Sequence, residues 1–127
     1  MRDLASNIAV VTALSPAVQS ATVNGVAVDT KGFGSVAFVL NTGAIAGSGD
    51  FGAKLQESDS SGSGFTDVAA ADLVGAFETT AVADATEKVS YVGHKRYVRL
   101  IFTKASGTSV AAGAVAILGH AAERPIA

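Results

Sequence analysis

The side chains that could carry chemistry gather in one stretch, residues 91–103, which reads YVGHKRYVRLIFT. It holds both tyrosines, one of the two histidines and three of the nine lysine and arginine residues. Lys95, Tyr97 and Arg99 are candidates for contact with an acidic partner surface, because tyrosine and arginine are enriched at protein interfaces. The alternative is that the charges pair with carboxylates across a β-sheet. Both interpretations stay open for Arg99, and pairing within the chain is favoured for Lys95.

The two histidines, His94 and His120, stand far apart in the chain, with no carboxylate at metal-ligand spacing to either. We expect surface or interface residues rather than metal ligands or general bases. No G-x-S-x-G motif places a serine nucleophile on a sharp turn. The sequence therefore predicts a non-enzyme with no catalytic, metal or cofactor site, and His120 and Arg124 are further interface candidates. A hydrolase would need a pocket that joins a histidine to an acidic residue.

Two glycine-rich segments match ligand-binding patterns only in part. The segment GSGDFG at 47–52 fits G-x-G-x-x-G, but a dinucleotide site needs a helix to follow, and FGAKLQES alternates as a strand does. The segment ESDSSGSG at 57–64 has only Glu57 and Asp59 as acidic groups, which is too few for an EF-hand calcium loop. We expect exposed turns at both places.

Composition narrows the class of protein. The chain has 127 residues, the length of one domain, and we predict a single domain over 1–127. Nine basic and eleven acidic residues are interspersed, without the basic patch of a nucleic-acid-binding protein. No stretch approaches the ~20 continuous apolar residues of a membrane span. A signal peptide is not expected, because Asp3 and Ser6-Asn7 interrupt the N-terminal apolar run.

The numbers of cysteine and alanine residues narrow the possible sites and the kind of core. Cysteine is absent, which excludes disulfides and thiolate metal sites. Alanine accounts for 25 of the residues, so large apolar side chains are few. We expect thin layers in which small residues let sheets approach closely, compatible with completion by a neighbouring subunit.

Short apolar and β-branched runs separated by turn residues predict an all-β chain. The run 8–14 could be a strand or a short helix closed by Pro16, and 69–75 could be a helical turn or a bent connection. A central strand at 35–41, almost continuously apolar, is expected to be covered on both faces, with a loop at 42–49. The other predicted strands are 18–23, 26–29, 50–58, 65–68, 86–92, 96–103 and 111–119.

The dipeptide Asn24-Gly25 lies between two β-like runs. Both residue types tolerate the positive φ angles of a type I′ turn, which is the strongest short-range hairpin signal. We therefore predict a hairpin whose two strands meet at this dipeptide.

Residues 91–103 are interpreted as two strands that meet at a turn at Gly93-His94, the first ending at Val92. Side chains of a strand alternate between its faces, so every second residue from 98 onward should face the core. The residues expected in the core are Val98, Leu100 and Phe102, and those on the other face are Tyr97, Arg99 and Ile101.

Seven to nine short strands, with turn signals every 8–12 residues, predict a single antiparallel β-sandwich of jelly-roll type. Residues 1–7 are expected to form an N-terminal arm and residues 120–127 a C-terminal tail. Extended termini of this kind can reach neighbouring subunits in an assembly.

Four segments resemble a family of small head proteins of tailed bacteriophages: KGFGSVAFVLNTGAI, KLQESDSSGSGFTDVAAADLVG, YVGHKRYVRLIFT and AVAILGHAAERP. The resemblance covers residues 29–125. Proteins of this kind include head decoration, or cement, proteins. The resemblance supplies no catalytic or binding residues.

The resemblance implies a virion component on the outer capsid surface that binds the lattice of the major capsid protein and stabilises the head. It also implies self-association as a dimer or trimer, and no nucleic-acid or membrane partner. The alternative is a tail, spike-base or head-fibre module that binds another virion protein or a host surface glycan. An exposed aromatic patch beside the loop 59–64 would favour that alternative.

Overall fold

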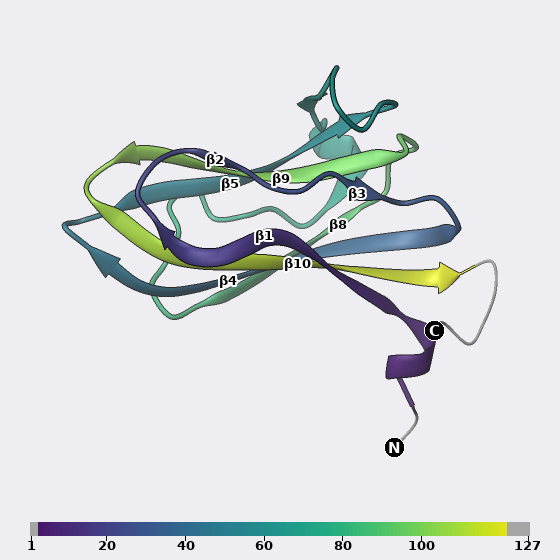
Figure 1. Cartoon of the computed structure of the whole chain (residues 1–127), viewed down its shortest axis with the longest axis horizontal. Coiled ribbons are helices and arrows are strands. Elements are labelled where there is room, and N and C mark those ends of the chain that lie inside the picture. Colours follow the sequence, from purple (N-terminus) through teal and green to yellow (C-terminus); the bar gives the residue numbers. More distant parts are fainter. Residues whose placement is uncertain (1–2, 122–127) are drawn as a thin grey trace.

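The computed structural model describes residues 3–121 as two antiparallel sheets packed against each other (Figure 1). Sheet A has the strand order β1-β10-β4-β8-β7, and sheet B has the order β2-β9-β5-β6, with β3 also paired to β9. The strands of sheet A are β1 Ala9–Gln19, β4 Phe33–Ala46, β7 Leu73–Val74, β8 Thr86–Tyr91 and β10 Ser109–Ala121. Those of sheet B are β2 Val23–Asn24, β3 Val28–Asp29, β5 Asp50–Ser58, β6 Thr66–Asp67 and β9 Tyr97–Ser106.

The strand pairs are nested along the chain. β1 pairs with β10, β2 and β3 pair with β9, β4 pairs with β8, and β5 pairs with β6. Early strands thus pair with late ones, and in Figure 1 β1 lies alongside β10 although they stand at opposite ends of the described chain. This is the arrangement of a jelly roll, in which a long hairpin is rolled into two sheets. The predicted all-β sandwich of jelly-roll type is confirmed.

The core lies between the sheets and is built from alternate residues of each strand. Val98, Leu100 and Phe102 of β9 are fully buried, as the alternation predicts. The rings of Phe102 and Phe51 stack with centroids 4.9 Å apart, which joins β9 to β5. Ile101, on the opposite face of β9, is also only 4% exposed.

β1 departs from the prediction at Pro16. The strand runs past this proline along β10, where the sequence predicts a break. Its pairing is irregular between Thr12 and Leu14 and between Leu14 and Ala17. Proline has no backbone N–H to donate, and an edge strand with bulges can leave that position unpaired. The strand therefore bends around Pro16 and continues to Gln19, so the separate strand predicted at 18–23 is wrong.

The hairpin predicted at Asn24-Gly25 is also wrong. β2 and β3 run in the same direction along β9, as two parts of one edge. The N–H of Gly25 donates to the carbonyl of Leu100 at 2.7 Å, and the N–H of Val26 donates to the carbonyl of Ala13 at 2.7 Å. A Cβ atom at Gly25 would overlap both carbonyl oxygens. Glycine is required here by close approach to both sheets, not by a positive φ.

The loop predicted at 42–49 is mostly strand. β4 continues to Ala46, and the turn into β5 is confined to Gly47 and Ser48, whose φ angles are 57° and 56°. β5 then covers Asp50–Ser58, as predicted. The G-x-G-x-x-G segment therefore leads into a strand, which lacks the helix N-terminus that a dinucleotide site needs.

Residues 91–103 are divided between the two sheets. β8 ends at Tyr91, one residue before the predicted end, and residues 92–96 cross to β9, which begins at Tyr97 in sheet B. The undecided segment 69–75 contains one helical turn, the 3-10 turn η2 Ala70–Asp72, which leads directly into β7.

The predicted arm 1–7 and tail 120–127 are described only in part. Near the N-terminus a 3-10 turn, η1 Ala5–Asn7, follows Asp3, whose carboxylate accepts hydrogen bonds from the backbone and hydroxyl of Ser6. At the other end β10 runs to Ala121, so His120 belongs to a strand. Residues 122–127, with the interface candidate Arg124, lie outside the described residues. Among residues 3–121 no helix is long and apolar enough to cross a membrane.

Candidate interaction surface

Sheet A has one face in the core and one face that sheet B does not cover, with only the segment around η1 beside it at one end. In β4, Val36, Phe38, Leu40 and Thr42 are buried, while the residues between them are partly or fully exposed. The prediction that 35–41 is covered on both faces is therefore wrong. We call the uncovered side of β1, β10, β4 and β8 the outer face of sheet A. Its residues on β4 and β10 are Ala37, Val39, Asn41, Gly43, Ala111, Gly113, Val115 and Ile117.

The outer face of sheet A is almost free of charge. β1, β4 and β10 contain no lysine, arginine, aspartate or glutamate. β8 contributes Lys88, which lies opposite Val39. Large exposed apolar patches on monomers mark sites of interaction, because leaving such surface in water is unfavourable. The outer face is therefore the strongest candidate interaction surface of the described chain.

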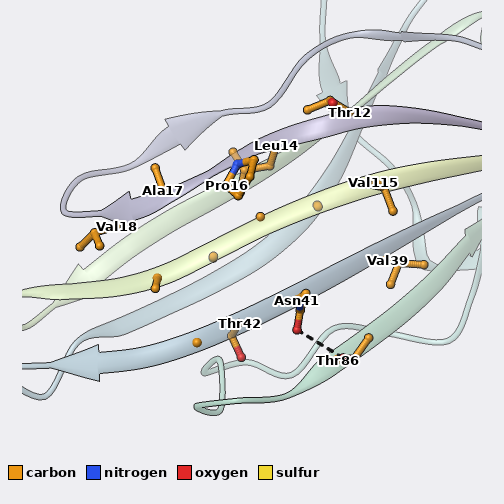
Figure 2. A pocket seen from close by; sticks show the side chains of 15 residues that line it. Thr12, Leu14, Pro16, Ala17, Val18, Val39, Asn41, Thr42, Thr86 and Val115 are labelled. Atoms are coloured by element: carbon orange, nitrogen blue, oxygen red, sulfur yellow. Dashed lines mark hydrogen bonds between the residues drawn. The ribbon is translucent and has the colours of Figure 1, made fainter.

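An open groove with a volume of about 810 Å³ lies in this face (Figure 2). β10 and β4 form its floor, β1 forms one side, and Thr86 at the start of β8 marks the other. None of its lining residues is charged. They are Thr12, Leu14, Pro16, Ala17, Val18, Val39, Asn41, Thr42, Gly43, Thr86, Ala111, Ala112, Gly113, Ala114 and Val115.

The side of the groove formed by β1 depends on the bend at Pro16. A Cβ atom at Gly113 of β10 would stand 2.8 Å from Cβ of Pro16, so only glycine lets the proline lie this close. Val18 follows in β1 and is 70% exposed at the side of the groove. The bulged strand and its proline also protect this edge of the sheet against pairing with other strands.

A second hollow, of about 340 Å³, lies at the other end of the same face. The segment around η1 borders it through Leu4, Asn7 and Ile8, and the sheet borders it through residues that include Ala37 and Ile117. Leu4 is 67% exposed although it borders an apolar hollow. The apolar character of the outer face thus extends from the groove to the N-terminal segment.

The outer face of sheet B is polar, and its side chains bond to one another. Nζ of Lys54 lies 3.2 Å from Oδ1 of Asp67, and Gln56 donates to the same carboxylate at 2.9 Å. Arg99 donates to Oε1 of Gln56 at 2.9 and 3.1 Å, and its guanidinium lies 4.2 Å from the ring centroid of Phe65. The interaction partners that the structure gives Arg99 therefore belong to this chain.

The other sequence-predicted interface residues are distributed over both sheets. Nζ of Lys95 lies 2.8 Å from Oδ2 of Asp59, so it pairs within the chain, as favoured. The ring of Tyr97 has the guanidinium of Arg96 5.0 Å from its centroid. His120 lies at the end of β10 in sheet A, away from Tyr97 in sheet B. The predicted candidates do not form one patch.

A partly buried hydrogen bond joins the two sheets. The hydroxyl of Tyr91, in β8, donates to Oε1 of Glu57, in β5, at 2.6 Å and accepts from the backbone N–H of Lys95 at 3.0 Å. Burial, followed by the bond to Glu57, raises the pKa of Tyr91 well above its ordinary value. The raised pKa favours the protonated phenol, the form that donates to Glu57.

The edge of sheet B at β3 carries a two-pronged ion pair. Arg96 donates to Asp29 through Nε at 2.9 Å and through Nη2 at 2.8 Å. These bonds, together with the backbone N–H of Lys31, lower the pKa of Asp29 to about 2. Both partners are roughly half exposed, so solvent screens the pair and its contribution to stability stays below about 1 kcal/mol.

This lowered pKa predicts an acid-dependent loss of stability. Because the pKa of Asp29 is lower in the folded chain, its contribution is present above the unfolded pKa of about 4 and is lost as pH falls towards 2. Urea unfolding of wild type and Asp29→Asn between pH 2 and pH 6 should show a gap at pH 5–6 that narrows below pH 4. A gap that is constant over the whole range would contradict a charge contribution from Asp29.

One serine and one histidine meet at the end of sheet A. Oγ of Ser35 lies 2.7 Å from Nδ1 of His120. A nucleophilic triad needs a third group, usually a carboxylate, that orients the histidine. In the described chain no carboxylate bonds to either histidine, and no cluster of three or more His, Cys, Asp or Glu residues could hold a metal ion. Within residues 3–121 the pair is a hydrogen bond between β4 and β10.

Comparison with known proteins gives no independent assignment. No protein-family model and no curated protein sequence matches the chain. The outer face of sheet A must be judged by its own chemistry. Sequence reasoning missed this face, although the absence of charge from 9–19, 33–46 and 109–121 was a usable signal.

Proposed function

We propose that this protein is a non-enzymatic bacteriophage virion component that decorates the capsid and stabilises the head, and that the outer face of sheet A docks on the major capsid protein. The uncharged, apolar outer face with its groove carries this proposal, because a free jelly-roll domain has no use for such a surface in water. The resemblance of residues 29–125 to phage head proteins indicates the class of partner.

The distribution of charge suggests the orientation of the domain. Three ion pairs lie in sheet B and the loops beside it, as on a solvated surface, whereas charged side chains are almost absent from the outer face of sheet A. Docking therefore places sheet A against the capsid and sheet B towards solvent. Few charges must be desolvated in this orientation, which avoids the main energetic penalty of burying polar surface.

Self-association as a dimer or trimer on the capsid is part of the same proposal. The alternative is a tail, spike-base or head-fibre module that binds another virion protein or a host glycan. Glycan sites commonly use open aromatic faces, but arginine side chains lie over Phe65, just before β6, and over Tyr97 at the start of β9. The exposed aromatic patch that would favour the alternative is therefore not found at these two rings.

A binding experiment with capsids tests the proposal. Purified protein is mixed with capsids that lack it, and the capsids are then sedimented and heated. We expect saturable co-sedimentation at micromolar protein and a higher temperature of capsid disruption, since a cement protein links neighbouring subunits. Absence of binding at micromolar concentration, or equal capsid stability with and without the protein, would overturn the proposed function. Electron microscopy of the particle separates a lattice position from a tail or vertex position.

A further inference from the structure

The size of the groove in the outer face of sheet A limits what can occupy it. Along β10 it extends over 111–115, which is about 14 Å at the rise of an antiparallel strand. Across the sheet it extends from β1 to β8, three strand spacings or about 14 Å. The resulting footprint is about 200 Å², roughly a quarter of the 800 Å² that each partner buries in a stable protein interface.

A second folded copy of this chain would therefore not be held by the groove alone. The footprint instead matches the length of four to five residues in an extended conformation. Such a segment fits between the side of the groove at Pro16 and Val18 and the opposite side at Thr86. A capsid would present many copies of such a segment. Many weak sites would then act together and raise the overall affinity.

The chemistry of the groove determines the kind of segment. Some of its polar side chains bond within the chain: the hydroxyl of Thr86 donates to Oδ1 of Asn41 at 3.4 Å, and the hydroxyl of Thr42 donates to the carbonyls of Val82 and Ala85. No lining residue could neutralise a charge. A charged side chain buried here would lose its hydration without compensation, whereas small apolar side chains would not.

We infer that the groove binds an extended, uncharged segment of the capsid partner, with small or β-branched apolar side chains directed at Val39 and Val115. The segment lies flat on the outer face and buries alternate side chains, as extended peptides do when pockets supply their specificity. This inference rests on the proposed function for the identity of the partner, but the chemistry of the groove can be tested without capsids.

The test uses nuclear magnetic resonance and a peptide probe. The probe is an acetylated and amidated heptapeptide with valines at alternating positions, serines between them and one proline to keep it monomeric. We expect backbone amide shifts confined to the strands lining the groove, with a dissociation constant of about 1 mM, as suits so small a footprint. The same peptide with two lysines in place of two valines should bind at least about tenfold more weakly.

Two valine variants provide the matched comparison. Val18→Asp places a charge at the side of the groove, at a position that is 70% exposed. This variant should remain folded and bind the probe about tenfold more weakly than wild type. Val26→Asp makes the same change at a position 54% exposed that does not line the groove, and it should leave binding unchanged. Shifts spread over sheet B, no shifts at 5 mM probe, or equal effects of the two variants would overturn the inference.

Two further measurements separate this inference from the proposed function. If sedimentation shows a dimer that Val18→Asp abolishes, the occupant is a second copy and the inference is wrong. If capsids bind wild type and Val18→Asp equally, the inference fails while the capsid function stands. If the probe binds the groove but capsids do not bind the protein, the proposed function fails and the groove remains a site for uncharged extended segments.

Discussion

Replacement of Phe102 by alanine is expected to lower the free energy of unfolding by about 3–5 kcal/mol, the range for removing a fully buried aromatic side chain. Phe102 is fully buried, and its ring stacks on Phe51 at 4.9 Å between centroids. Truncation would remove this contact and leave a cavity in the core between the two sheets, which the surrounding strands could fill only in part. Urea unfolding followed by circular dichroism measures the loss.

The neighbouring residue supplies a control for Phe102→Ala. Thr103 is on the same strand but exposed, so Thr103→Ala should change the free energy of unfolding by no more than about 0.5 kcal/mol. If Phe102→Ala cost less than about 2 kcal/mol, the core between the sheets would be looser than its burial indicates.

The second large effect is expected at Gly25. Gly25→Ala should destabilise the chain by about 1–3 kcal/mol or more, because the added methyl group overlaps the carbonyl oxygens of Ala13 and Leu100. Those oxygens belong to strands of different sheets, so the overlap can be relieved only by moving the sheets or by breaking the hydrogen bond from Gly25 to Leu100. Thermal unfolding of the purified variant measures the effect.

Gly62→Ala is the matched control for this substitution. Gly62 lies in the exposed loop 59–64, and a Cβ atom there would meet nothing within 4 Å. This variant should be as stable as wild type or slightly more stable, because alanine restricts the unfolded chain. Equal stability of the two variants would show that the two sheets can separate at Gly25 at little cost.

Strand residues 98–102 and Gly25 illustrate why part of the fold could be predicted from the sequence and part could not. The alternation at Val98, Leu100 and Phe102 is a local property of one strand, so the sequence identifies its buried side correctly. The need for glycine at Gly25 comes from Ala13 and Leu100, which are distant in the chain. Asn24-Gly25 was therefore interpreted as a turn from its local conformational preference. The glycine is in fact required by contacts with residues that are distant in the sequence.

Contacts with strands that are distant in the sequence also explain why the predicted boundaries of β4 and β1 were wrong. Glycine and alanine at 42–46 suggest a loop, but pairing with Val110 and Ala112 of β10 keeps the segment extended. Pro16 suggests a break, but an edge strand tolerates it. In both cases the partner strand, far away in sequence, overrides the local preference.

Prediction of the candidate site was less successful than prediction of the fold. Charged and aromatic residues such as Arg99 and Tyr97 draw attention in a sequence, yet their charges and rings find partners in the same chain. The outer face of sheet A is composed of small and apolar residues that are ordinary one by one. Only the sheet order shows that three uncharged strands lie side by side and form a single surface.

The nested pairing of the strands also dictates when this surface comes into being. β1 pairs with β10, and about 90 residues separate the end of one from the start of the other. At typical translation rates the first strand waits about 5–20 s for its partner to be synthesised, and closing so long a loop makes jelly-roll folding intrinsically slow. The groove between β1 and β8 cannot exist before β10 is inserted. The groove is therefore completed only late, after almost the whole chain has been synthesised.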